Sequence, residues 1–224
     1  MPPYSLDLDP DQLLTTTRAV RRRLDFDRPV PRELVEECLE IAVQAPSGSN
    51  ARGWHFVLVG DPEKRQAIGD LYRKAFDDYR TMPYSAHALA ENAKTAETDT
   101  MNAVVSSAET LAENLHRAPW LAIACQTGRV PLVEGPIGHL LQASVWGSVA
   151  PAFWSFMLAA RARGLGTAWT TLHLTYEREI ADLLGIPFDE VMQAALSPVA
   201  FTIGTDFKPA QNRGLDGVLH VDGW

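Results

Sequence analysis

The 224 residues of this chain carry a net charge of −8, and 46% of them are hydrophobic. This length suits one large domain with a core of its own, and the acidic balance argues against general binding of nucleic acids or anionic membranes. Cys38 and Cys125 both lie within apolar runs, so we expect buried thiols in a reducing compartment. With no signal-peptide pattern at the first residues and no apolar run judged long enough to span a bilayer, the sequence predicts a cytoplasmic protein.

Arginines are concentrated just after the first expected helix, which is capped at Asp9 and runs towards Val20. The cluster places four arginines within six positions: Arg18, Arg21, Arg22 and Arg23. A solvated surface is the ordinary interpretation of such a charge run, whereas guanidinium groups also pair bidentately with phosphate or carboxylate. Because an acidic protein gains little from clustered cations that nothing neutralises, the pattern favours an anion-binding site.

A turn of unusual composition separates the next helix from the first strand. Apolar residues at helical spacing predict a helix over 34–45 that ends at Pro46, and residues 55–59 read as a strand. Between them lie two serines, two glycines, Asn50, Arg52 and an indole. Small residues let a ligand approach the main chain, and Asn and Arg offer donors to its polar edges. A plain helix end rich in turn formers is the equally open alternative.

The middle of the chain is expected to contain a surface excursion between two helices. Asp61 begins a helix whose apolar face reaches Tyr79. Residues 80–101 are alanine-rich and polar without a strong apolar face, and we interpret them as an excursion that can form a mobile lid. Apolar spacing returns over 104–115 and predicts another helix.

The second half of the chain alternates apolar strands and helices. The expected elements are a strand at 120–125, a helix at 140–162, a short strand at 167–171, a helix at 176–185 and a last core strand at 194–203. Pro151 should kink the long helix, and Pro198 should mark a bulge or an edge in the last strand. This order favours a mixed α/β or an α+β sheet layered with helices.

No side-chain pattern in the sequence has the spacing of a hydrolase, a zinc site, a P-loop or a dinucleotide-binding motif. The sequence offers instead two basic segments, the N-terminal arginines and the pair Lys208/Arg213, with small-residue turns at 46–54 and 164–171. This combination suits a flat, phosphorylated cofactor. A protein that holds such a cofactor needs few catalytic side chains, so we expect no catalytic residue and no metal ligand.

Three segments, in this order, resemble the FMN-dependent nitroreductase family, and the chain looks most like its actinobacterial members. They are residues 17–22 followed by 29–31, residues 44–50 with Trp54 before a strand, and residues 159–171 followed by 203–204 and Arg213. The resemblance implies an α+β fold, with a mixed β-sheet flanked by helices, in a single domain over residues 1–224. It also implies an intertwined homodimer with two FMN molecules at the dimer interface.

The resemblance assigns each segment a part in holding FMN. Arg18 matches a phosphate contact, and Arg21 matches the cation near the N1–C2 carbonyl edge of the flavin. Asn50 matches a polar contact to the ring edge, residues 46–48 match the segment reaching the flavin from the partner subunit, and residues 167–170 match the backbone facing N5 and O4. The implied cofactor-binding set, with the C-terminal phosphate ligands last, is Arg18, Ala19, Arg21, Arg22, Pro46, Ser47, Gly48, Asn50, Thr167, Ala168, Trp169, Thr170, Lys208 and Arg213.

Two positions depart from the family's pattern. Ala19 stands where many members have serine, which removes a hydroxyl contact worth roughly 1 kcal/mol. Arg52-Gly53 stands where many members have Gln-Pro. Arg52 is therefore a candidate for binding an anionic substrate or the phosphate of the nicotinamide cofactor.

The resemblance implies an FMN-dependent oxidoreductase. Hydride from NAD(P)H would pass through flavin N5 to a nitroaromatic or quinone-type acceptor in a ping-pong cycle, and Arg21 would stabilise the negative charge near N1 of the reduced flavin. The expected partners are a second copy of the chain, the nicotinamide and a small aromatic acceptor. Two alternatives stay open: a flavin-binding or storage protein without catalysis, and a related chemistry such as reductive dehalogenation or flavin cleavage.

Overall fold

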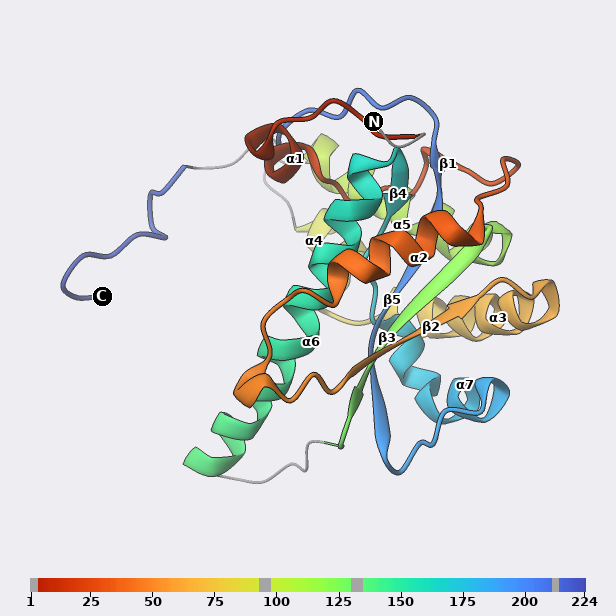
Figure 1. The fold of residues 1–224 in the computed structure, drawn as a ribbon. Coiled ribbons are helices and arrows are strands. Elements are labelled where there is room, and N and C mark those ends of the chain that lie inside the picture. The colour runs from red at the N-terminus through yellow and green to blue at the C-terminus, as the bar shows by residue number, and fades with distance from the viewer. Residues whose placement is uncertain (1–3, 93–97, 130–134, 211–213) are drawn as a thin grey trace.

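Helices cover both faces of a β-sheet in the computed structural model, which describes residues 4–92, 98–129, 135–210 and 214–224 (Figure 1). The helices are α1 (Pro10–Thr16), α2 (Arg32–Ala42), α3 (Pro62–Tyr79), α4 (Ala86–Glu91), α5 (Thr98–Asn114), α6 (Pro136–Ala162) and α7 (Glu177–Leu184). The strands are β1 (Leu24–Asp25), β2 (Trp54–Val59), β3 (Trp120–Thr127), β4 (Leu165–Thr167) and β5 (Val191–Thr202).

β5 is the strand to which most of the others attach. It pairs antiparallel with β3, which in turn pairs antiparallel with β2, and the last residues of β5 pair antiparallel with β1 and β4. A separate bridge between Ala19 and Thr167 adds a parallel contact. The strand order and the helices on both faces confirm the predicted α+β class. All pairings between the named strands are antiparallel, so the only parallel component among the described residues is this isolated bridge.

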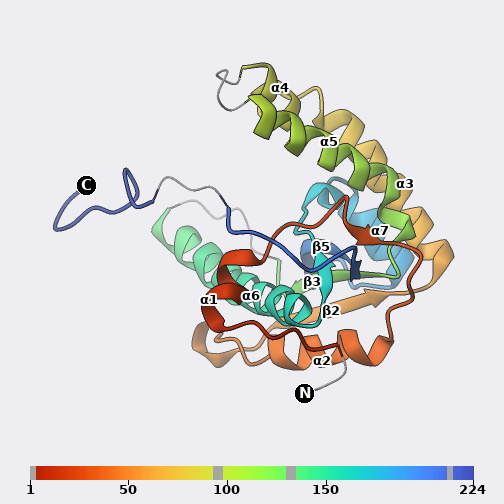
Figure 2. The same cartoon turned by 90° about the horizontal axis from the view of Figure 1, so that it is seen from above.

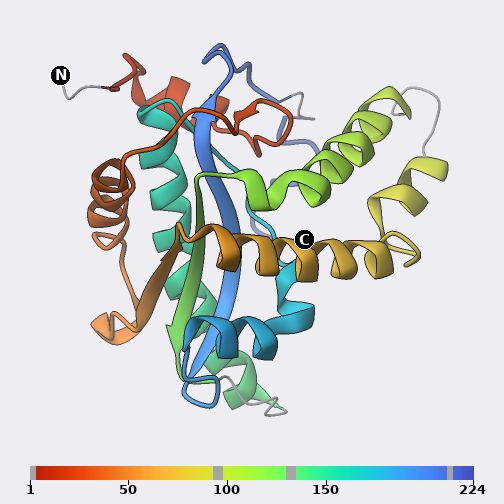
Figure 3. The same cartoon turned by 90° about the vertical axis from the view of Figure 1, so that its right-hand side faces the viewer.

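The two faces of the sheet carry different helices. α2 and α6 cover one face, whereas α3, α5 and α7 cover the other, as the edge-on view in Figure 3 shows. Successive residues of a strand point to opposite faces, so Leu121 and Ile123 of β3 pack towards α3 while Ala122 packs towards α6. The small side chain leaves room for Phe153 and Phe156 of α6, whose stacked rings lie 5.7 Å apart and are completely buried.

The two cysteines lie in the two cores on either side of the sheet. Cys38 of α2 belongs to the core beneath α6, and Cys125 of β3 belongs to the core beneath α3. Both are buried free thiols, as the apolar runs around them predict. Burial raises the pKa of each thiol to about 12.

α6 begins at Pro136, earlier than predicted, and continues through Pro151 to Ala162. By length and composition it is apolar enough to cross a membrane, so the expectation that no apolar run reaches that length is wrong. In this fold it packs against α2, β3 and β4 as a core helix. Its other side leaves apolar side chains in solvent, with exposed fractions of 67% for Leu140, 41% for Trp146 and 40% for Trp154.

Two helices differ in extent from the prediction. α1 ends at Thr16 rather than near Val20, because the chain then turns to the sheet and the Val20 N–H donates to the Thr167 carbonyl over 2.8 Å. α5 begins at Thr98, inside the expected excursion, and α4 adds a short helix capped by the Ser85 side chain. Residues 93–97 of that excursion lie outside the described residues.

Pro198 lies inside β5, beside a gap in the hydrogen-bond ladder. Leu196 and Thr170 exchange two backbone hydrogen bonds of 2.9 Å, so the N–H groups of alternate residues along β5 face the segment after β4. Pro198 has no N–H group, and opposite it the segment after β4 makes no backbone pairing with β5. The Ala168 N–H there donates instead to the Ser197 hydroxyl over 2.9 Å. The strand predicted at 167–171 is therefore β4 followed by an isolated bridge at Thr170.

His173 gives the fold a dependence on pH. Its side chain is completely buried, and neither ring nitrogen has a hydrogen-bond partner among the described residues. Burial lowers the pKa of His173 from 6.5 to about 3, so between these values the unfolded chain binds a proton that the folded chain does not. Stability is therefore intact above pH 6.5 and falls as the pH falls, by about 2 kcal/mol between pH 7 and pH 5.

Urea unfolding at pH 7 and pH 5 measures this loss. The variant His173→Leu should lose about 2 kcal/mol less than the natural chain over the same interval, because leucine does not titrate. His220→Leu, at an exposed position near the C-terminus, is the control and should keep the natural pH dependence. Equal slopes for His173→Leu and the natural chain would contradict the assignment.

Candidate functional site

A cavity of about 360 Å³ opens where the segment after β4 faces α3 and α5. Its polar groups are the Arg21 guanidinium, from the turn after α1, and the side chains of Thr170 and Thr171. The rest of its wall is mostly aromatic or aliphatic and comprises Tyr72, Phe76, Tyr79, Ala86, Val104, Ala108, Leu111, Trp169 and Leu172. One cation and a few hydroxyl groups in an apolar wall suit a flat ligand with a polar edge.

Thr170 is held in this wall by a buried phenol. The hydroxyl groups of Tyr72 and Thr170 lie 2.8 Å apart, and Tyr72 is only 3% exposed. Burial raises the pKa of Tyr72, and the Thr170 hydrogen bond and the charge of Arg21 offset part of that rise. Trp169 is fixed on the other side, because its ring packs edge-on against Phe153 with centroids 5.1 Å apart.

β4 brings the arginine segment and the segment 167–170 side by side. Val20 donates to the Thr167 carbonyl, and Ala19 forms the parallel bridge with the same residue. Gly166 permits this close approach, since a Cβ there would lie 2.8 Å from Thr202 Cγ2 and 3.0 Å from Val20 Cβ. Segments about 145 residues apart in sequence therefore meet at one edge of the cavity.

The clustered arginines have different surroundings. Arg21 is half-buried, and its Nη1 lies 3.3 Å from the Ser107 hydroxyl of α5. Arg18 and Arg22 are exposed and have no hydrogen bond or ion pair with any described residue. Arg23 is occupied, because its Nε donates to the Ile203 carbonyl over 2.8 Å and its Nη2 pairs with Asp206 at 2.6 Å. The guanidinium groups of Arg18 and Arg22 thus remain available to a ligand. We call the place formed by residues 18–23 the arginine corner.

The C-terminal segment returns to the same corner. The ion pair between Arg23 and Asp206 and the stacking of Arg23 on the Phe207 ring at 4.3 Å hold residues 203–207 against the arginine segment. Lys208 follows directly and is exposed. Arg213, the other C-terminal candidate, lies outside the described residues.

The turn 46–52 lies elsewhere, packed on α6 on the opposite face of the sheet (Figures 1 and 3). The Gly48 N–H donates to the Ser148 hydroxyl over 3.0 Å, and a Cβ at Gly48 would lie 2.4 Å from the Ser144 hydroxyl. Within one chain, therefore, Pro46, Ser47, Gly48 and Asn50 do not line the cavity that contains Arg21 and Thr170.

The same turn has a strained backbone and is held together by hydrogen bonds between its own residues. Ser49, Asn50 and Arg52 have φ values of 52°, 53° and 49°, in the left-handed region that side chains disfavour. The Arg52 Nε donates to the Asn50 side-chain oxygen over 3.1 Å, and the Arg52 N–H donates to the Ser47 hydroxyl over 3.0 Å. These bonds hold the exposed guanidinium of Arg52 at the surface of the turn.

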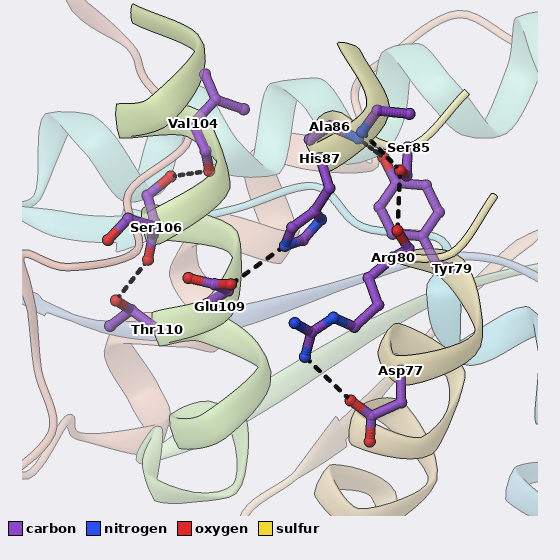
Figure 4. A network of polar contacts seen from close by, with 12 residues as sticks. Asp77, Tyr79, Arg80, Ser85, Ala86, His87, Val104, Ser106, Glu109 and Thr110 are labelled. Atoms are coloured by element: carbon purple, nitrogen blue, oxygen red, sulfur yellow. Dashed lines mark hydrogen bonds and ion pairs between the residues drawn. The ribbon is translucent and has the colours of Figure 1, made fainter. Parts of the chain in front are cut away.

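α4 closes one side of the cavity and is tied to both of its neighbours. The Ala86 N–H donates to the Tyr79 hydroxyl of α3 over 2.9 Å, and the His87 ring lies 3.1 Å from the Glu109 carboxylate of α5 (Figure 4). The His87 ring also meets the edge of Phe76, with centroids 5.8 Å apart. α4 and the adjoining part of α5 project from the body of the molecule (Figure 2), where a lid would lie.

The model of the Nitroreductase family matches residues 14–204. The chain belongs to the nitroreductase family.

Two solved structures and one curated relative illustrate the likeness of this chain to other members of the family. The FMN and NADPH-dependent nitroreductase NfnB of sphigopyxis sp. strain HMH superposes with a TM-score of 0.66 at 20% identity, covering 97% of this chain and 100% of that one. Iodotyrosine deiodinase, bound to FMN and 3-iodo-L-tyrosine, superposes with a TM-score of 0.63 at 22% identity, covering 89% of this chain and 94% of that one. The 4-nitrobenzoate reductase of Nocardioides sp. (strain LMS-CY) is 26% identical over 84% of this chain and 78% of its own length.

Sequence reasoning missed the aromatic wall of the cavity. Tyr72, Phe76 and Tyr79 were visible only as the apolar face of a helix, because their spacing is the same whether they meet the core or a ligand. Ser107, which contacts Arg21, carried no signal.

The hydroxyl pair in the cavity wall can be tested by stability. Tyr72→Phe and Thr170→Val should each lower the free energy of unfolding, and the double variant should lose less than the sum, with a coupling of about 1 kcal/mol. Urea unfolding of the four proteins measures it. Tyr176→Phe is the matched control, because no described residue hydrogen-bonds its hydroxyl and its contact with Lys74 uses only the ring. Strict additivity would contradict the pair.

Proposed function

We propose that this nitroreductase is an NAD(P)H-dependent oxidoreductase that binds FMN and reduces a flat aromatic acceptor, a nitroaromatic or a quinone, in a ping-pong cycle. The observation that carries this proposal is the cavity in which the Arg21 cation and the Thr170 hydroxyl face an aromatic wall. NfnB is an FMN and NADPH-dependent nitroreductase and the Nocardioides relative is a 4-nitrobenzoate reductase, which supports the same class of donor and acceptor. Bound FMN would supply the hydride chemistry.

The donor set at the arginine corner fits the phosphate of FMN. Arg18 and Arg22 are exposed guanidinium groups without partners among the described residues, and Lys208 extends the cationic surface. A phosphate dianion binds such groups through charge-assisted, bidentate hydrogen bonds. We propose that Arg18, Lys208 and Arg213 hold the phosphate, with Arg22 beside them.

Arg21 has a different part in this proposal. It is half-buried at the cavity, where a positive charge acts more strongly than in bulk water. It would stabilise negative charge that develops on the ring edge during reduction, as a fixed charge placed before the reaction. Thr170, oriented by Tyr72, would present its hydroxyl to the polar edge of the ring, and Ala19, Thr167, Ala168 and Trp169 would form the backbone beside it.

We propose that the second half of the site comes from a partner subunit. The turn 46–52 packs on the α6 face, and Leu140, Trp146 and Trp154 leave an apolar surface exposed on that helix. Burying such a surface against a second copy would remove it from water and would let the partner's turn approach the flavin. In this arrangement the Arg52 guanidinium would bind an acidic acceptor or the nicotinamide phosphate.

A flavin storage protein is the alternative outside enzymology, and dehalogenation or flavin cleavage is the alternative within the family. An exposed face of the bound flavin would favour an enzyme, because a storage protein needs no space for a second ligand. The likeness to iodotyrosine deiodinase concerns the fold. Product analysis of the reduced protein with nitroaromatic, halogenated and oxygen acceptors separates these chemistries. A cytoplasmic location remains our proposal, supported by the two buried thiols.

Assembly tests the shared site. Light scattering at micromolar concentration should give the mass of a dimer, and Trp154→Glu should shift it towards the monomer and lower flavin content, because a buried charge opposes association. Leu89→Glu, at a similarly exposed apolar residue on α4, is the control and should stay dimeric. A stable monomer of the natural chain would contradict both the interface and the shared flavin site.

The roles of the arginines give the test of the function itself. Arg18→Ala should weaken FMN binding by roughly ten- to a hundredfold, since a charge-assisted bond is worth about 1.5–3 kcal/mol, and turnover should return when FMN is in excess. Arg21→Ala should bind oxidised FMN nearly as before, yet slow reduction by NAD(P)H and lower the reduction potential of the bound flavin.

Fluorescence titration, rapid-mixing reduction and potentiometry measure these effects. Flavin released by heat from the natural protein should co-migrate with FMN rather than FAD. Full recovery of Arg21→Ala with added FMN would make Arg21 a phosphate ligand and contradict its assigned part. Failure of the natural chain to bind any flavin would end the proposal.

A further inference from the structure

Arg161 is a buried cation at the end of α6. Its side chain belongs to a residue only 4% exposed. Its Nη2 donates both to the Thr16 hydroxyl over 3.2 Å and to the Thr205 carbonyl over 3.1 Å. Nε and Nη1 have no hydrogen-bond partner among the described residues. A guanidinium in this setting therefore connects α6 to two segments that are far apart in sequence.

Both segments lead directly to the cationic groups of the arginine corner. Thr16 ends α1, two positions before Arg18, and Thr205 precedes Lys208 by three positions. The Phe207 ring contacts two guanidinium groups, that of Arg161 at 5.0 Å and that of Arg23 at 4.3 Å from the ring centroid. Arg161 thus lies behind the corner and joins its N-terminal and C-terminal halves.

The two hydrogen bonds of Arg161 to Thr16 and Thr205 need a donor but do not need a positive charge. No ion pair joins Arg161 to a carboxylate of the described residues, and the charge that acts on its pKa is the like charge of Arg23. Burial first, and Arg23 second, lower the pKa of Arg161 from its usual value. A neutral side chain could fill this space without the desolvation penalty of a charge. A buried charge kept among like charges points to an anion nearby.

We propose that Arg161 is a positioning residue of the cofactor-phosphate site, which sets the spacing of the Arg18 and Lys208 segments and adds its buried charge to the field at the phosphate. This inference rests on the proposed binding of FMN. The alternative is a strut that only stabilises the core. The two roles differ in how loss of Arg161 changes the affinity for a flavin without a phosphate. If Arg161 only stabilises the core, its loss weakens the binding of every flavin, whereas if it positions the phosphate site, its loss weakens the binding of FMN alone.

Binding of FMN and riboflavin to the full chain, freed of flavin, distinguishes them. Riboflavin has the same ring system as FMN and lacks the phosphate. Arg161→Met should raise the Kd for FMN by about tenfold or more and leave the Kd for riboflavin within about twofold, because the loss falls on charge-assisted contacts to the phosphate. Arg161→Lys keeps the charge but not the fork that spans Thr16 and Thr205, and should lie in between.

Arg163→Met is the matched control. Arg163 lies one position beyond the same helix, pairs with Glu37 of α2 and contacts neither basic segment, so both affinities should stay unchanged. If Arg161→Met does not fold, Thr16→Val removes the hydroxyl partner from the other side and should weaken FMN binding selectively, whereas Thr16→Ser should not.

Equal losses for FMN and riboflavin, or no loss for either, would overturn the inference and leave FMN binding by the natural chain intact. A natural chain that binds the two flavins equally would overturn the phosphate assignment as well, and one that binds neither would overturn the proposed function.

Discussion

The hydrogen bonds along β5 are the constraint on which the candidate site depends. Through them β4 is fixed at the end of the strand, and the exchange between Thr170 and Leu196 fixes the residues beyond β4. The N-terminal arginine segment attaches next, through Val20 and Ala19 to Thr167, and Arg23 accepts the Ile203 N–H at its carbonyl. The main chain beside Arg21 and at Thr170 is therefore placed by the hydrogen bonds of the sheet.

The sheet also separates the molecule into two working faces. The core under α6 uses alanines on the sheet so that two stacked phenylalanines can lie close to it, and the core under α3 uses larger residues. The cavity opens on the α3 and α5 side, whereas the strained turn 46–52 lies on the α6 side. A site built from both faces would need two chains, and in the proposed dimer the exposed apolar surface of α6 would bring those chains together.

Much of the fold followed from the sequence because local signals agreed with it. Apolar runs located β3 and β5, helical spacing located α2 and α3, and Pro198 indicated the irregularity beside Ser197. The extents of α1 and α5 could not be predicted, because the first is cut short by pairing with Thr167 and the second extends through polar residues without an apolar face. The family resemblance selected Arg21 and Thr170, but only the structure showed that a phenol from α3 holds Thr170. Arg161 could not be found from sequence, since burial of a charged side chain leaves no local pattern.

The buried cysteines have a practical consequence. At a pKa of about 12, only about one thiol in 100,000 is ionised at neutral pH, and both are shielded from reagents by the cores around them. An alkylating dye should therefore not react with the natural chain, but should react with a cysteine introduced at the surface. Cys38 and Cys125 therefore need not be removed before a single labelling site is introduced. A fluorophore attached to α4 in this way would follow the motion of that helix relative to the sheet.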